Sequence, residues 1–243
     1  MDVLAIGNSF SQDANKYFRE VAAAAGVNVF NANLFIGGCP LELHFRNMKA
    51  DAEAYLLEIA GIGTGFYTSI KKALLSRPWS VVTVQQSSPS SPKLESYSPY
   101  GDELVKYIRE LCPKAKIYVH QTWAYDDASP RIQALGFENR AAMFAAIKSS
   151  YSAFAEKVGV DGIIPSGEAL EKLTALGAEK VHRDMHHTDL GIGRYTLALT
   201  WLETLTGVSA IGNSFRGFAV PLTEAEVEMA QNAAHEACAL YNK

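Results

Sequence analysis

The chain has 243 residues and a net charge of −4, and its 22 basic and 26 acidic residues are interspersed without a basic run. This charge pattern argues against nucleic acid or an anionic membrane as a partner. No stretch reaches the roughly 18 apolar residues that a membrane span needs. The three cysteines, Cys39, Cys112 and Cys238, form no C-x-x-C motif, which argues against a disulfide framework or a structural zinc site.

Short β-branched runs alternate with helical patterns along the chain. Strands are expected at residues 3–6, 27–36, 81–84, 116–120 and 162–164. Helices are expected at residues 15–25, 100–111, 139–158, 191–206 and 224–241. Continuous apolar strands separated by helices are typical of a parallel sheet covered on both faces. We therefore expect a three-layer α/β/α sandwich with a five-stranded, mostly parallel, doubly wound sheet, and residues 1–243 as a single domain.

Unusual polar residues and glycines follow the ends of the first three strands. Ser9 follows the first strand, Gly38 the second, and Gln85-Gln86 the third. In an open α/β sheet the ligand site lies outside the carboxyl ends of the strands. These residues should therefore converge on one rim.

Ser9 is the candidate nucleophile. It lies in Gly7-Asn8-Ser9-Phe10-Ser11, at the amino end of a helix, where free N–H groups and the helix dipole favour developing negative charge. A serine at this point could equally be a helix cap. The hexapeptide of residues 5–10 recurs at 210–215, but the second copy has no strand before it, so we expect Ser214 to lie in a loop.

The candidate base lies far along the chain, in the histidine-rich stretch 182–188. Asp184 and His187 are three residues apart, so one short turn can present both to a pocket that contains Ser9. The carboxylate would hold the imidazole tautomer and stabilise the imidazolium. Three histidines within six residues also allow a metal site, although no further cluster stands out to complete one. A surface turn with incidental histidines is the third interpretation.

Acyl transfer also needs hydrogen-bond donors for an oxyanion. Gly38 could supply a backbone N–H, and Gln85 or Gln86 a side-chain amide. The two glutamines could instead brace loops. Cys39 is a poor candidate nucleophile, because no basic residue lies beside it in sequence.

Taken together, four blocks resemble the SGNH hydrolase superfamily, also called GDSL-like esterases. The blocks are Gly7-Asn8-Ser9-Phe10-Ser11, Ile36-Gly37-Gly38, Val84-Gln85-Gln86-Ser87-Ser88 and Asp184-Met185-His186-His187. Further stretches, residues 4–11, 82–86, 121–125 and 164–167, resemble a bacterial family of unknown function within that superfamily. The resemblance spans residues 3 to 207 and implies a flavodoxin-like sheet.

The resemblance implies a role for each block. Ser9 would be the nucleophile, His187 the general base and acid, and Asp184 its orienting carboxylate. The N–H groups of Ser9 and Gly38 would form part of the oxyanion hole. His186 is a rival to His187, which the D-x-x-H spacing favours.

Two positions depart from the superfamily pattern. Asn8 stands where Asp is usual, and the third block lacks the usual Gly-x-Asn. The side-chain oxyanion donor is therefore open, with Gln86 as the choice and Gln85 and Ser88 behind it.

The leading expectation is a serine esterase that hydrolyses small esters, in particular acetyl esters of a carbohydrate, without a metal or cofactor. An aromatic and polar rim would suit a sugar ring, with Gln85, His120 and Trp123 as substrate-binding residues and Gln86 and Tyr125 beside them. A non-catalytic carbohydrate- or acyl-binding module on the same fold is the alternative. A nucleotide binder is disfavoured, since no G-x-G-x-x-G or P-loop pattern follows the first strand.

The first apolar run follows Met1-Asp2 directly, with no pattern of a signal peptide before it. We therefore expect a cytoplasmic protein, or an exported one whose leader has been removed.

Overall fold

The computed structural model describes residues 1–241, and in these residues the strands form one seven-stranded sheet in the order β4-β3-β2-β1-β5-β6-β7. The strands are β1 (Asp2–Gly7), β2 (Phe30–Phe35), β3 (Tyr55–Ile59), β4 (Ile62–Thr68), β5 (Val81–Val84), β6 (Lys116–His120) and β7 (Gly162–Ile164). β2, β1, β5, β6 and β7 are parallel, whereas β3 pairs antiparallel with both of its neighbours, β2 and β4. The carboxyl ends of the five parallel strands therefore meet at one edge.

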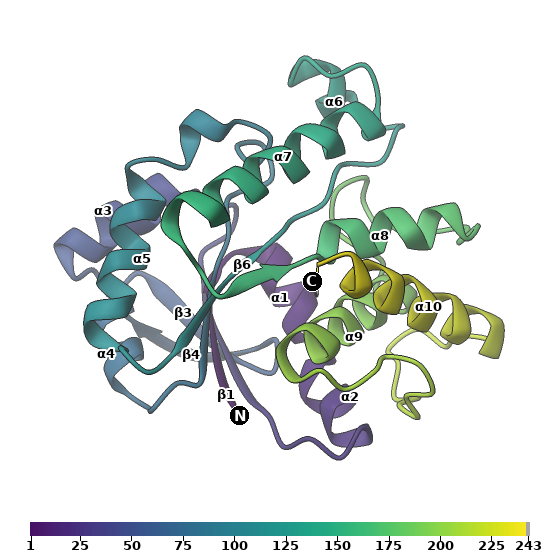
Figure 1. Cartoon of the computed structure of the whole chain (residues 1–243), viewed down its shortest axis with the longest axis horizontal. Coiled ribbons are helices and arrows are strands. Elements are labelled where there is room, and N and C mark those ends of the chain that lie inside the picture. The colour runs from purple at the N-terminus through teal and green to yellow at the C-terminus, as the bar shows by residue number, and fades with distance from the viewer. Residues whose placement is uncertain (242–243) are drawn as a thin grey trace.

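Helices cover both faces of the sheet (Figure 1). One face is covered by α3 (Leu41–Ala50), α4 (Ile70–Leu75), α5 (Tyr100–Leu111) and α7 (Arg140–Val158). The other is covered by α1 (Ser9–Asn15), α2 (Phe18–Ala24), α8 (Ser166–Ala175), α9 (Ile192–Thr206) and α10 (Glu224–Tyr241). The short helix α6 (Pro130–Ala134) stands apart at one end of the molecule (Figure 1). The arrangement confirms the expected three-layer α/β/α class.

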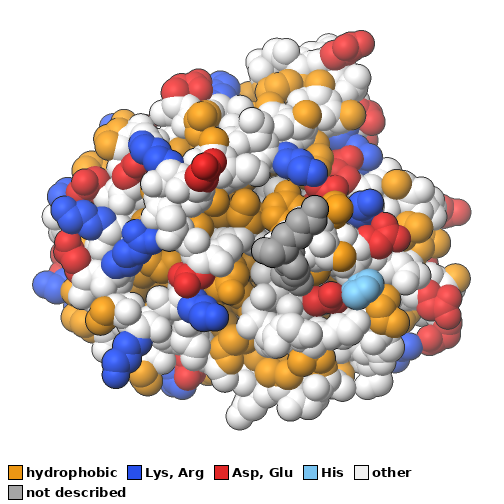
Figure 2. All heavy atoms as spheres, in the orientation of Figure 1, with side chains coloured by type: hydrophobic (Ala, Val, Ile, Leu, Met, Phe, Trp, Pro, Cys, Tyr) orange, Lys and Arg blue, Asp and Glu red, His pale blue; other side chains and the backbone are white. Residues whose placement is uncertain are grey.

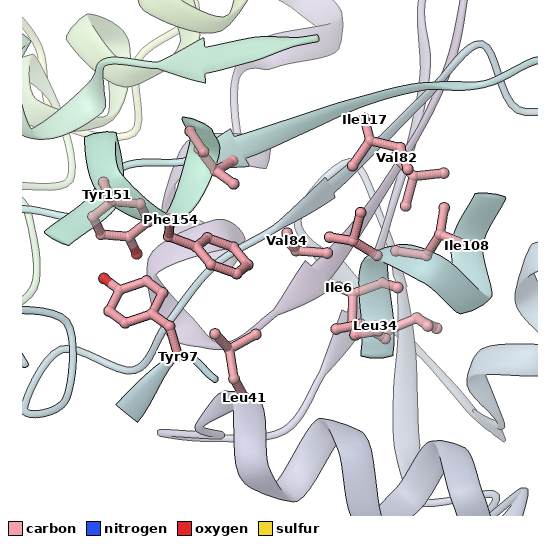
Figure 3. Close-up of a cluster of buried hydrophobic side chains, with 14 of the residues drawn as sticks. Ile6, Leu34, Leu41, Val82, Val84, Tyr97, Ile108, Ile117, Tyr151 and Phe154 are labelled. Carbon is pink, nitrogen blue, oxygen red and sulfur yellow. The ribbon is translucent and has the colours of Figure 1, made fainter. Parts of the chain in front are cut away.

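The sheet separates two hydrophobic cores because side chains alternate along a strand. In β1, Leu4 and Ile6 face the core under α3, α5 and α7, whereas Val3 and Ala5 face the core under α1 and α9. Figure 3 shows the first of these cores, where apolar side chains of several strands and helices meet. A strand that is apolar on both faces requires cover on both, which explains the continuous apolar runs.

The predicted strand count was too low. β3 and β4 form a hairpin whose two turn residues, Ala60 and Gly61, both have positive φ, at 49° and 65°. A two-residue turn with positive φ at both positions has a twist that matches the right-handed twist of the two strands it joins. A side chain at Gly61 would lie 2.9 Å from the Lys16 backbone, so only glycine fits this turn against α1. The hairpin extends the parallel sheet at its β2 edge.

Several helices also differ from expectation. The helix expected over residues 15–25 is α2, and a separate helix, α1, precedes it and begins at Ser9. α3, α4, α6 and α8 were not predicted.

Basic and acidic side chains are interspersed over the face shown in Figure 2, as the sequence suggests. Within residues 1–241, no helix is both long enough and apolar enough to cross a membrane.

Candidate active site

Ser9 is the first residue of α1, directly past the carboxyl end of β1. Asn8 caps this helix, because its side-chain oxygen accepts a hydrogen bond of 3.0 Å from the Phe10 N–H. The same side chain donates to the Cys39 carbonyl at 3.2 Å and accepts from the Gln85 amide at 2.8 Å. It therefore ties together the loops that follow β1, β2 and β5. Since Asn8 is the cap, the Ser9 hydroxyl is available for another partner.

That partner is His187. Its Nε2 lies 2.8 Å from the Ser9 Oγ, although the two residues are 178 positions apart in sequence. Its Nδ1 lies 2.8 Å from Asp184 Oδ2, and Asp184 Oδ1 accepts a 2.8 Å hydrogen bond from the His187 backbone N–H. Because a carboxylate only accepts, the proton lies on Nδ1, which leaves Nε2 free to accept from the serine hydroxyl. The three side chains form one continuous hydrogen-bonded chain.

Asp184 is held in its charged form. Partial burial acts to raise the pKa of this carboxyl, but the hydrogen bonds from the His187 ring and backbone and the nearby histidine charge outweigh it. The pKa of Asp184 therefore lies well below its ordinary value. The carboxylate remains ionised beside the imidazole and can stabilise a positive charge on it.

His186 takes a different position from its neighbour. Its Nδ1 lies 3.1 Å from the Asp184 backbone carbonyl and 3.2 Å from Asp184 Oδ1. Burial, together with the nearby His187 charge, lowers the pKa of His186. The contact with Ser9 belongs to His187, which agrees with the D-x-x-H spacing.

A buried ionic cluster anchors the segment that carries Asp184 and His187. Asp13, one turn along α1 from Ser9, is fully buried and accepts hydrogen bonds from Arg183 at 3.0 and 2.9 Å and from Arg194 at 2.8 Å. Arg183 also donates to the Thr188 carbonyl at 2.6 Å. The ion pairs therefore connect α1 to the loop on either side of His187 and to α9.

Gly38 lies where the sequence suggests, on the loop after β2 beside Ser9. Its φ of 62° is a conformation that favours glycine, and a side chain there would meet nothing within 4 Å. Ser9, as the first helical residue, has a backbone N–H without an intrahelical acceptor. Ser9 and Gly38 line the same cavity.

Gln86 does not reach this position, contrary to expectation. Its side chain is buried, donates to the carbonyl and hydroxyl of Ser96, and accepts from the N–H groups of Leu41 and Ser87. A fully engaged amide braces the loops, which is the alternative that the sequence left open. Ser88 instead lines the cavity, with its Oγ 2.9 Å from the Tyr125 hydroxyl.

Ser9 and His187 line a cavity of about 530 Å³. The wall consists of Asn8, Ser9, Phe10, Gly37, Gly38, Ser88, Pro89, Tyr125, Arg131, Ala134, Leu135, His186 and His187. Most of this wall is apolar. The volume of the cavity lies in the range of pockets that bind small molecules.

The three expected substrate-binding residues lie behind this wall. Gln85, His120 and Trp123 are at most 2% exposed, and none of them lines the cavity. His120 Nδ1 lies 2.8 Å from the Gln85 side-chain oxygen, and its Nε2 lies 2.9 Å from Ser166 Oγ. Trp123 stacks on Phe10, with ring centroids 4.0 Å apart. The polar groups of Gln85 and His120 and the Trp123 ring therefore contact other buried residues. These side chains pack behind the cavity wall and are not open to a substrate.

Two other candidates can be placed. Burial raises the pKa of the fully buried Cys39 thiol to about 12, so the thiol stays protonated and inaccessible. Asp184, His186 and His187 could each offer a metal ligand, since one ligand atom from each lies within 4.8 Å of the others. A cation there would compete with the hydrogen bonds that join Asp184, His187 and Ser9.

Sequence reasoning missed Arg131, Phe10 and the Asp13–Arg183 pair. Arg131 lies on α6, a helix that the sequence pattern does not indicate. Asp13 and Arg183 are 170 positions apart, and neither belongs to a recognisable motif. The prediction that Ser214 lies in a loop is confirmed, and its side chain is exposed.

The three-layer fold is that of SGNH hydrolases. Two solved structures share it at low identity. A proposed SGNH hydrolase from Slackia heliotrinireducens is 19% identical, with a TM-score of 0.62 over 84% of this chain and 98% of that one. A proposed GDSL-like lipase from Parabacteroides merdae is 16% identical, with a TM-score of 0.57 over 85% and 95%.

The chain belongs to the family described as domain of unknown function DUF4886, whose model matches residues 2–237. A crystal structure of a DUF4886 family protein from Bacteroides uniformis is 38% identical, with a TM-score of 0.89 over 98% of this chain and 94% of that one. A comparison with curated proteins found no match. The expected membership of a family of unknown function is confirmed, and so is the likeness in fold to SGNH hydrolases.

Proposed function

We propose that the protein is a serine esterase, with Ser9 as nucleophile, His187 as general base and acid, and Asp184 as the orienting carboxylate. The observation that carries this proposal is the continuous hydrogen-bonded chain from Ser9 Oγ through His187 to Asp184, at 2.8 Å for each link, on the wall of a cavity. A serine hydroxyl needs such a base to act as a nucleophile at neutral pH.

In the first half of the reaction, Ser9 Oγ attacks the ester carbonyl carbon while His187 Nε2 takes the hydroxyl proton. The carbonyl π electrons move onto oxygen and give a tetrahedral oxyanion. His187 then gives its proton to the leaving alcohol oxygen, the C–O bond to the alcohol breaks, and acyl-Ser9 remains. Asp184 stabilises the imidazolium and does not itself take the proton.

In the second half, water takes the place of the alcohol. His187 removes a proton from the water, whose oxygen attacks the acyl carbon, and the tetrahedral intermediate collapses. The bond from the acyl carbon to Ser9 Oγ breaks, and His187 returns the proton to that oxygen. The products are one carboxylic acid, one alcohol and the unmodified serine.

The oxyanion would accept hydrogen bonds from the backbone N–H groups of Ser9 and Gly38. For the third donor we propose the Ser88 hydroxyl in place of the Gln86 amide, because Ser88 lines the cavity and Gln86 is engaged elsewhere. Preorganised donors of this kind typically contribute more than any other single factor in acyl transfer.

For the substrate we propose a short-acyl ester, such as an acetyl ester. The sugar hypothesis relied on five polar and aromatic side chains, Gln85, Gln86, His120, Trp123 and Tyr125. All five are buried, and only Tyr125 lines the cavity. Four of these side chains therefore give no support to a sugar site. A carbohydrate alcohol is one candidate leaving group among others, and acetate release from peracetylated glucose tests it.

The proposal is tested by the hydrolysis of p-nitrophenyl acetate, butyrate and octanoate. We expect wild type to prefer the acetate and both Ser9→Ala and His187→Ala to lose activity. Ser214→Ala is a matched control, because it makes the same change in the second copy of the hexapeptide, and it should retain full activity. Absence of wild-type turnover on all three esters and on peracetylated glucose would favour the non-catalytic binding module.

A further inference from the structure

Arg131 is the one permanently charged side chain on the cavity wall, all of whose residues lie in the described part of the chain. It projects from α6, and the wall around it is formed largely by apolar residues such as Ala134, Leu135 and Pro89. Arg131 is itself exposed to solvent, so an anion that enters the cavity from solvent can reach its guanidinium.

The neighbouring acidic residues are committed to other partners. Asp126 accepts a hydrogen bond from the Ala128 N–H at 2.9 Å and lies 3.8 Å from the His182 ring. Asp127 accepts a 2.7 Å hydrogen bond from the Arg140 N–H. No ion pair involves the Arg131 guanidinium within residues 1–241. Its five N–H donors are therefore available to a molecule in the cavity.

Aromatic contacts connect Arg131 to the reacting groups. Its guanidinium carbon lies 6.0 Å from the centre of the Tyr125 ring, and that ring meets the His186 ring edge-on, also at 6.0 Å. His186 in turn lies against His187, with ring centroids 4.0 Å apart. Burial is the main reason that the pKa of His186 is lowered, and the Arg131 charge adds to the effect. The guanidinium thus lies beside Tyr125 and His186, on the wall of the same cavity that Ser9 lines.

We propose that Arg131 binds a negatively charged group, in particular a carboxylate, that the ester carries apart from the bond that Ser9 attacks. This inference rests on the proposed esterase function and names its substrate class, a short-acyl ester with a negative charge on its acyl or alcohol part. The guanidinium is planar and donates two parallel hydrogen bonds, which matches the two oxygens of a carboxylate. The charge selects the substrate, and the apolar wall holds the remainder of it.

The test compares pairs of esters that differ in one charge. Mono-p-nitrophenyl adipate and p-nitrophenyl hexanoate place the difference on the acyl part, and 3-acetoxybenzoate and 3-acetoxybenzamide place it on the alcohol part. We expect wild type to prefer the anionic member of one pair by about twofold to fivefold in kcat/KM, the effect of an ion pair at an exposed side chain. The pair that shows the preference identifies the part of the substrate that Arg131 contacts.

Variants assign the preference to Arg131. Arg131→Gln should abolish the preference by slowing the anionic esters much more than the neutral ones, whereas Arg131→Lys should retain part of it. Arg19→Gln is the control, because it removes the same charge from an exposed position on α2 that does not line the cavity. The preference should also fall as salt is added. Equal effects of Arg131→Gln on anionic and neutral esters would overturn the inference.

A binding measurement separates this inference from the proposed function. Calorimetry with Ser9→Ala compares 3-hydroxybenzoate with 3-hydroxybenzamide, which requires no turnover. Stronger binding of the benzoate that disappears in the Ser9→Ala, Arg131→Gln double variant supports the anion site even if wild type hydrolyses no ester. Equal binding of the two compounds, with no charge preference in hydrolysis, contradicts the anion site and leaves an active Ser9 unaffected.

Discussion

The carboxylate of Asp13 and the guanidinium of Arg183 are joined by two hydrogen bonds of 3.0 and 2.9 Å across 170 residues of sequence. Asp13 lies on the helix that begins with Ser9, and Arg183 directly precedes Asp184 in the loop that carries His187. The pair therefore fixes the position of His187 relative to Ser9.

Arg183→Met should reduce both stability and turnover. Breaking a buried ion pair typically costs about 3–5 kcal/mol, and here the cost should lie toward the lower limit, because Asp13 retains Arg194. We expect kcat to fall by about tenfold to a hundredfold with little change in KM, since small misplacements of reacting groups are costly. Urea unfolding and steady-state kinetics measure the two effects.

Arg194→Met is the matched control. It removes the other ion-pair partner of Asp13, from α9, and leaves the loop that carries His187 attached. It should lower the free energy of unfolding by a similar amount with a smaller fall in kcat. Equal falls in kcat for the two variants would mean that the cluster is only structural.

Asp184→Asn should abolish most of the activity without unfolding the protein. An amide can donate to the imidazole, which permits the tautomer whose Nε2–H faces Ser9 and cannot accept its proton. We expect kcat to fall by about 10³ to 10⁴, measured with p-nitrophenyl acetate. A variant with more than a tenth of wild-type kcat would show that the carboxylate does not set the tautomer.

The lowered pKa of Asp184 also predicts the wild-type pH profile. An acid whose pKa is lowered is ionised at every pH above its ordinary value of about 3.9. Any acid limb in kcat/KM above pH 5 must therefore come from another group.

Ser88→Ala and Gln86→Ala should have different consequences. Loss of one oxyanion donor typically costs about 10² to 10³ in kcat, and a hydroxyl donor at the cavity wall should fall toward the lower limit. Gln86→Ala removes the partners of Ser96, Leu41 and Ser87, so it should mainly lower the midpoint of thermal unfolding. The reverse pattern would return the donor role to Gln86.

The sequence predicts the parallel half of the sheet well, because strands such as β1 and β5 are continuous apolar runs between helices. The hairpin of β3 and β4 could not be predicted in the same way. β4 contains Gly63 and Gly65 and is mostly exposed, so neither an apolar run nor a regular alternation marks it. Its edge position removes the need for burial on both faces.

For the site, the sequence predicts which residues come together but not the directions of all their side chains. Ser9 and His187 belong to motifs whose spacing specifies their geometry. Gln86 and Ser88 both follow β5 within four residues of its end, and only packing in three dimensions decides that one turns into the core and the other toward the cavity. His120 and Trp123 were expected at the rim because they are polar or aromatic, yet both are buried on the side of the sheet that α1 and α9 cover.

Two buried histidines should make the protein less stable in mild acid. Burial lowers the pKa values of His44 and His120 to about 3 each. Between the unfolded value near 6.5 and the folded value, only the unfolded state takes up the proton, so stability is complete above pH 6.5 and is lost as pH falls toward 3. Each histidine should cost about 2 kcal/mol between pH 7 and pH 5.

His120→Asn tests one of these two contributions. It should be destabilising at pH 7, because it disrupts the hydrogen bonds with Gln85 and Ser166. The loss of stability between pH 7 and pH 5, measured by urea unfolding, should however be smaller than in wild type by about 2 kcal/mol. An unchanged pH dependence would mean that His120 is protonated in the folded protein.

The most direct test of Ser9 as the nucleophile is the labelling of the protein with a fluorophosphonate, followed by mass spectrometry of its peptides. We expect one adduct per chain, on Ser9, in wild type and in Ser214→Ala, and no adduct in Ser9→Ala or His187→Ala. Unlabelled wild type, or an adduct on another serine that persists in Ser9→Ala, would contradict the assignment of Ser9 as the nucleophile.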